Sequence, residues 1–190
     1  MNTQNRNRLV LGLGLWFAAA VAMAADDDHL RLQRGGNQVL SSKEGPRTVS
    51  IQIETKHIVP LDGKSGAFGY AALSDGGNNV LVLTTHLPID DSSHEAADSG
   101  FHTHVLDLKA PTSACGGASF EVDFDNSKKN TGFDAGYRWS IRGANLEIRD
   151  VPVAELGDAG IEGLASFTLK PILGADGKPT NLCVTVVDQI

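Results

Sequence analysis

The sequence predicts an all-β fold: an antiparallel β-sandwich or barrel of about eight to nine strands with one disulfide, preceded by a cleaved signal peptide. Three observations support this prediction. Apolar and polar residues alternate with period two in many short segments, turn signals rich in Gly, Asn and Asp recur about every 8 to 14 residues, and no segment shows a clear helical period. These are features of a domain built from antiparallel strands.

The first residues of the chain have the pattern of a secretion signal. Arg6 and Arg8 supply positive charge, residues 9–22 are apolar, and a small-x-small cleavage site ends at Ala24. We therefore expect residues 1–24 to be a signal peptide that directs export to the periplasm or the extracellular space. The apolar segment is too short and too soon followed by acidic residues to predict a membrane anchor, so no membrane insertion is expected after cleavage.

Two regions are expected in the mature chain. Residues 25–46 are polar and rich in Gly, Ser, Asn and Gln, which predicts a flexible N-terminal arm with one short strand near Val39 and Leu40. Residues 47–190 are long enough to bury a core and are expected to form a single β-sandwich domain.

The first four expected strands are 48–59, 66–73, 80–85 and 101–108. Segment 48–59 alternates branched apolar residues with polar ones, as a half-buried strand does. Segment 66–73 contains Gly69, which predicts a bulge or a close approach of another part of the chain. Segment 80–85 is a continuous apolar run and predicts a buried central strand.

The later strands follow the same alternation. In segment 118–124, Phe120, Val122 and Phe124 are expected to face inward, and Glu121 and Asp123 outward. In segment 137–142 the two aromatic residues and Ile141 are expected on the buried face. The remaining expected strands are 145–151, 163–169 and 181–187.

The two cysteines, Cys115 and Cys183, are predicted to form a disulfide, because an even pair in an exported protein is most simply oxidised. The bond would close a loop of about 70 residues and stabilise the fold by roughly 4 kcal/mol. The alternative, a pair of thiolate metal ligands, is disfavoured by the oxidising compartment and by the distance between the cysteines in the sequence.

Composition excludes several classes of partner. The chain has 16 basic and 23 acidic side chains and a formal net charge of −7, and it becomes more acidic when Arg6 and Arg8 leave with the signal. Nucleic acids and anionic membranes bind clustered Lys and Arg, so neither is expected as a partner. Both methionines also lie in the signal, which removes the thioether ligands of a copper(I) carrier.

Four of the six histidines lie in one stretch, residues 86–104. They are His86, His94, His102 and His104, and the acidic residues Asp90, Asp91, Glu95 and Asp98 lie between them. Residues i and i+2 of a strand point to the same face, so the last two histidines are expected to share a face of segment 101–108. A hairpin-like connection would bring the histidine that ends segment 80–85 next to them.

This cluster predicts a metal site. Imidazole suits zinc, copper(II) and nickel, and three histidines, or two with a carboxylate, make a typical site. We predict that the protein binds one Cu(II) or Zn(II) ion through His86, His102 and His104, completed by His94 or an acidic residue. The corresponding function is that of an exported binding protein for a divalent transition metal.

Two other functions remain open at this point. A metal ion with an open position could activate water in a hydrolase, with Glu95 or Asp98 as the general base; the sequence has no Gly-x-Ser-x-Gly elbow or phosphate-binding glycine loop. Alternatively, the chain is a non-catalytic envelope module for adhesion or protein–protein interaction, in which the histidines are incidental and the acidic loop is simply solvated.

Overall fold

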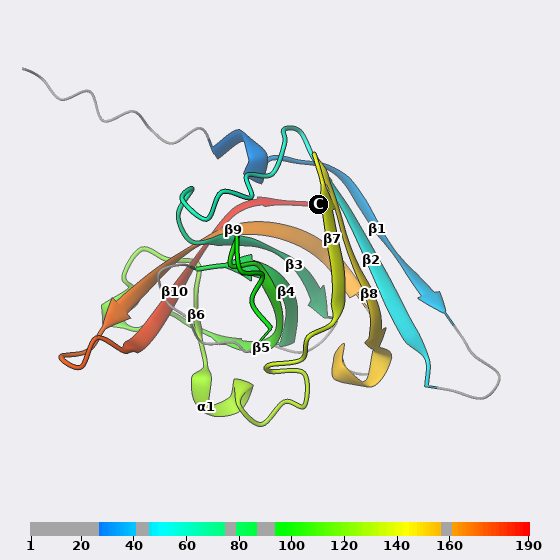
Figure 1. Ribbon diagram of the computed structural model, residues 1–190. Helices are drawn as coiled ribbons and strands as arrows, with labels where there is room; N and C mark the ends of the chain where they lie inside the picture. Colours follow the sequence, from blue (N-terminus) through cyan, green and yellow to red (C-terminus); the bar gives the residue numbers. More distant parts are fainter. Residues whose placement is uncertain (1–26, 41–45, 75–78, 87–93, 157–160) are drawn as a thin grey trace, which may run out of the picture.

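Ten β-strands form two antiparallel sheets within the residues that the computed structural model describes, which are 27–40, 46–74, 79–86, 94–156 and 161–190. One sheet has four strands, and the other closes into a six-stranded barrel (Figure 1). The prediction of an all-β fold with sandwich or barrel architecture is confirmed. The predicted signal peptide, residues 1–24, lies outside the described residues.

The strands follow the predicted segments closely. The four-stranded sheet has the order β1 (Leu32–Leu40), β2 (Thr48–Thr55), β8 (Asn145–Pro152) and β7 (Arg138–Arg142). The barrel has the order β10 (Pro179–Gln189), β6 (Phe120–Val122), β5 (His102–Lys109), β4 (Asn79–Thr85), β3 (Phe68–Ser74) and β9 (Ile161–Leu173). Four short helical turns connect them: η1 (Asp27–Leu30), η2 (Ser113–Cys115), α1 (Phe124–Ser127) and η3 (Val153–Leu156).

Strands β3, β4 and β5 are buried on both faces. On one face, side chains such as Leu81, Leu83 and Val105 join the core that lies between the barrel and the four-stranded sheet. On the other face, Val82 and Leu106 belong to a second core inside the barrel. This double burial explains why residues 80–83 are all apolar and do not alternate with polar residues.

Gly69 marks a close approach within the barrel, as predicted. A Cβ atom at this position would lie 2.6 Å from the ring of Phe167 on β9 and 2.8 Å from the carbonyl oxygen of Leu83 on β4. A larger residue would push two neighbouring strands apart, so glycine is required by the packing and not by an unusual backbone angle.

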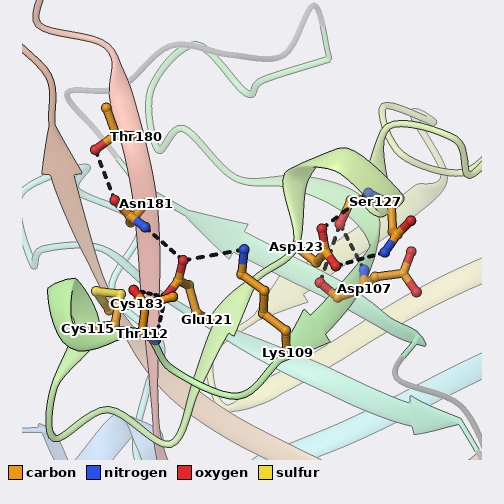
Figure 2. Close-up of polar contacts among 11 residues, drawn as sticks. Asp107, Lys109, Thr112, Cys115, Glu121, Asp123, Ser127, Thr180, Asn181 and Cys183 are labelled. Carbon is orange, nitrogen blue, oxygen red and sulfur yellow. Dashed lines mark hydrogen bonds and ion pairs between the residues drawn. A yellow bond between two sulfur atoms is a disulfide. The ribbon is translucent and has the colours of Figure 1, made fainter.

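The barrel closes through β6, which has only three residues. Glu121 and Phe120 pair with Cys183 and Val184 of β10, and the other side of β6 pairs with the end of β5. The predicted disulfide is confirmed: Cys115 of η2 is bonded to Cys183 of β10 (Figure 2). The disulfide therefore lies beside the ladder between β6 and β10, which has only two residue pairs, as does the ladder between β6 and β5.

Glu121 is buried, with 1% of its surface exposed, which corrects the prediction that it faces outward to solvent. The backbone N–H and the hydroxyl of Thr112 donate hydrogen bonds to its carboxylate at 2.9 and 2.7 Å, and the side-chain amide of Asn181 donates another at 2.7 Å. The ammonium of Lys109 lies 3.5 Å away (Figure 2). The Thr112 N–H, the Asn181 amide and the Thr112 hydroxyl together lower the pKa of Glu121 to about 2.

The segment predicted as a flexible arm with one short strand near Val39 and Leu40 contains η1 and the longer strand β1. Leu30 and Leu32 are buried at their start, and the hydroxyl of Tyr70 donates a hydrogen bond to the carbonyl of His29 at 3.0 Å. Residues 33–39 are exposed, and Val39 is the one large apolar residue among them, so this strand is held by backbone pairing with β2 and leaves no alternating pattern in the sequence. No helix in the described part of the chain is long and apolar enough to cross a membrane.

We predict that the double variant Cys115→Ser/Cys183→Ser is less stable by about 4 kcal/mol, because the unfolded chain regains the freedom of a loop that spans 68 positions. Urea unfolding of the variant and of the oxidised protein measures the difference. A reducing agent should lower the stability of the original protein and leave the variant unchanged. Equal unfolding midpoints for the variant and for the oxidised original protein would show that the disulfide does not stabilise the fold.

Glu121 should make the free energy of unfolding depend on pH in the acidic range. Its pKa of about 2 in the folded protein lies below the ordinary value of 4.5, so its contribution is complete above pH 4.5 and is lost as the pH falls towards 2. Glu121→Gln should lose about 1–3 kcal/mol at pH 7, since hydrogen bonds to a charged acceptor are replaced by weaker ones. Between pH 7 and pH 3, the free energy of unfolding should therefore fall less steeply for the variant than for the original protein. Parallel curves for the two proteins would be evidence against this role of Glu121.

Candidate metal centre

Three histidines meet inside one end of the barrel. His86 follows the last residue of β4, and His102 and His104 lie on the neighbouring strand β5. The register pairs Thr84 with His102 and Val82 with His104, so their side chains all point to the barrel interior. His102 and His104 share one face of β5, as predicted, and this arrangement places both of them next to His86.

The three imidazoles form a tight, buried group. One ligand atom from each ring lies within 4.8 Å of the ligand atoms of the other two. The ring centroid of His102 is 4.7 Å from that of His86 and 4.6 Å from that of His104. The exposed fractions of the residues are 3% for His86, 0% for His102 and 4% for His104.

Backbone carbonyls orient two of the rings. The Nδ1 atom of His102 lies 2.8 Å from the carbonyl oxygen of Gly100, and Nδ1 of His104 contacts the carbonyl oxygen of Phe133. A carbonyl oxygen only accepts hydrogen bonds, so each Nδ1 carries the proton and the Nε2 atom of the neutral ring keeps its lone pair. An outer hydrogen bond of this kind typically fixes the tautomer of a metal-binding histidine.

Of the acidic residues of the predicted site that the structure describes, Glu95 lies next to a histidine of this group. Its Oε1 atom is 3.5 Å from Nδ1 of His102, on the side of the ring that faces Gly100. Asp98 is exposed, and Asp90 and Asp91 lie outside the described residues.

His94, the fourth predicted ligand, is not part of the group of three ligand atoms. Its side chain is exposed and lies against Gly136, where a Cβ atom would come within 2.6 Å of its Nδ1.

The arrangement of the triad fits a transition metal ion. Three nitrogens bound to one tetrahedral ion at about 2.0–2.1 Å lie roughly 3.4 Å from one another. The three ligand atoms all lie within 4.8 Å of one another, so each pair needs to close by about 1.4 Å at most, which rotation of the side chains provides. Three neutral imidazoles leave at least one further position on such an ion.

Sequence reasoning did not identify the carbonyl groups of Gly100 and Phe133. The contact with Gly100 had a signal in the sequence, because a glycine two residues before His102 indicates a turn of the backbone. In the structure Gly100 adopts a φ of 66°. Phe133 had none, because it lies 29 positions from His104 in a loop that the sequence does not align with β5. Comparisons of the chain with protein-family models, curated proteins and solved structures found no match.

We predict that the neutral rings of His102 and His104 are both Nδ1–H tautomers in the metal-free protein. Long-range proton–nitrogen correlation spectra distinguish the two tautomers by the shifts and couplings of the ring nitrogens. His57, which is exposed and outside the group, serves as an internal reference. An Nε2–H pattern for either buried ring would show that the carbonyl contacts do not set the proton position.

Proposed function

We propose that the protein is an exported, non-catalytic binding protein for one Cu(II) or Zn(II) ion, held by the Nε2 atoms of His86, His102 and His104. The observation that carries the proposal is that three buried ligand atoms on two adjacent strands lie within 4.8 Å of one another.

The donor set favours these two ions over softer or harder ones. Imidazole nitrogen is a good ligand for Zn(II) and Cu(II), whereas Ca(II) and Mg(II) prefer oxygen. The two cysteines are joined in a disulfide, and no free cysteine is found in the described chain. A thiolate site of the kind that selects Cu(I) is therefore not part of the proposal.

Two features support export. The signal pattern of residues 1–24 and the disulfide between Cys115 and Cys183 both suit a periplasmic or extracellular protein. A metal-binding role in that compartment means delivery, buffering or sensing of the ion.

The position of Glu95 favours binding over hydrolysis. Its carboxylate lies on the Nδ1 side of His102, and a metal on Nε2 would be on the opposite side of the same ring. From there the carboxylate orients the histidine and does not reach a metal-bound water. We therefore assign Glu95 a positioning role.

The proposal is tested by titrating the chelator-treated protein with Cu(II) and Zn(II) in a calorimeter. We expect one ion per chain, and at least about a 100-fold loss of affinity in each of His86→Ala, His102→Ala and His104→Ala, because even outer-shell changes cost 10–100-fold. His94→Ala and His57→Ala are matched controls, since both histidines are exposed and lie outside the triad.

Binding should also stabilise the fold. An ion at about 100 times its dissociation constant adds roughly 2.7 kcal/mol, which corresponds to a rise of roughly 5–10 °C in Tm for a domain of this size. Unchanged affinity in the triad variants, or an equal loss in the two controls, would reject the proposed site. Circular dichroism of each variant establishes that a loss of binding does not come from unfolding.

A further inference from the structure

An apolar cavity inside the barrel leads to the histidines. Its volume is about 280 Å³, and His86 and His104 form part of its lining. The wall between them and the far end is made of aliphatic and aromatic side chains from all six barrel strands, among them Val82, Leu106, Val122, Phe167, Leu182 and Val184. The metal centre is therefore one end of a pocket and not an isolated cluster.

Polar residues line the cavity at the start of β4, the end of that strand opposite His86. Ser74 ends β3 and Asn79 begins β4, and together with Glu162 and Gln189 they form a polar rim to the lining. Glu162 and Gln189 are exposed, whereas the two histidines in the lining are almost completely buried. A molecule that enters at the rim meets the apolar wall first and the histidines last.

Charged side chains are scarce among the described residues that line the cavity. Among the described residues that line the cavity there is no Lys or Arg, and the one carboxylate, Glu162, is at the rim. A divalent ion on the three neutral histidines would thus supply the positive charge in the interior. An anionic group buried there is stable only if it is paired, and the ion is the partner that the site offers.

The volume limits the size of the occupant. A cavity of about 150 Å³ holds a benzene molecule, so 280 Å³ accommodates roughly ten to twelve non-hydrogen atoms. A medium-length alkyl chain or a substituted aromatic ring with one polar group has this size. Larger lipids with two chains do not fit.

We infer that the cavity binds a monoanionic amphiphile of about ten non-hydrogen atoms, whose head group ligates the metal while its apolar tail fills the barrel. The inference rests on the proposed metal site, because the ion provides the fourth ligand position and the compensating charge. The protein then recognises a metal ion and a small organic acid together. Each of the two ligands raises the affinity for the other.

Octanoate is the probe. It is titrated into metal-free protein and into protein loaded with Zn(II), and the visible absorption of protein loaded with Co(II) reports directly on the coordination of the metal. We expect at least about 100-fold tighter binding to the loaded protein, since an unpaired anion is excluded from the apolar interior. The Co(II) bands should shift on saturation with octanoate, and 1-octanol, which has the same tail without the charge, should leave them unchanged.

A series of carboxylates on the unaltered protein tests the cavity itself. From acetate to octanoate, each added methylene should raise the affinity about fourfold, and the gain should stop once the chain exceeds the cavity. Ala165→Phe places a ring in the cavity wall at a residue that is not a proposed metal ligand, and it should weaken octanoate binding more than tenfold while leaving Zn(II) affinity and acetate binding unchanged.

The outcomes separate the two proposals. Absence of metal binding overturns the proposed function and this inference with it. Tight metal binding with equal octanoate affinity for loaded and metal-free protein, with unshifted Co(II) bands, or with no dependence on chain length overturns this inference alone. Metal-dependent, length-dependent binding that shifts the bands supports both, and the chain-length series does not depend on whether Ala165→Phe folds.

Discussion

Closure of the six-stranded barrel depends on its shortest strand. β6 contributes two residue pairs to β10 and two to β5, a small number of backbone contacts for a join that shields the interior from water. The disulfide from Cys115 to Cys183 and the hydrogen bonds to Glu121 act at this same join. One covalent and one polar restraint thus hold together a ladder that is too short to be stable alone. The apolar cavity and the histidines exist as an enclosed space because of them.

The positions of the strand histidines are fixed by their neighbours on the opposite face of β5. Phe101, just before the strand, is fully buried, and the centroid of its ring lies 6.0 Å from the ring centroid of Trp139 in the four-stranded sheet. The hydroxyl of Thr103 donates a hydrogen bond to the carbonyl of Ala135 at 2.6 Å. These contacts anchor the backbone between and beside His102 and His104, so the site is arranged before any ion binds. Little ordering remains to be done on binding, which favours affinity.

Much of this fold could be predicted from period-two alternation. Segments 80–85 and 101–108, the pairing of the two cysteines and the shared face of His102 and His104 all follow from local patterns and from the chemistry of export. The choice between sandwich and barrel did not follow, because it depends on register between distant strands. Only the end of strand β1, near Val39 and Leu40, was predicted, because its exposed residues carry no apolar alternation and its stability comes from backbone pairing.

Glu121 shows a different limit of pattern reasoning. Alternation correctly placed it on the opposite face from Val122, but that face is covered by Thr112 and Asn181, the latter 60 positions away in the sequence. The carbonyl of Phe133 beside His104 is a contact of the same type. Partners supplied by loops distant in sequence decide whether a polar residue on a strand faces water or a built polar site, and no single segment contains that information.

The apolar wall of the barrel would also govern how fast a bound ion leaves through the rim. A divalent cation moving along that wall would pass side chains such as Val82, Leu106 and Val184, which offer neither oxygen nor nitrogen in place of its water shell. The barrier for departure by this route would therefore be set by dehydration along the path as well as by the strength of the three nitrogen bonds. Residence time, more than equilibrium affinity, would then distinguish the proposed metal-binding protein from one that holds its ion at the surface.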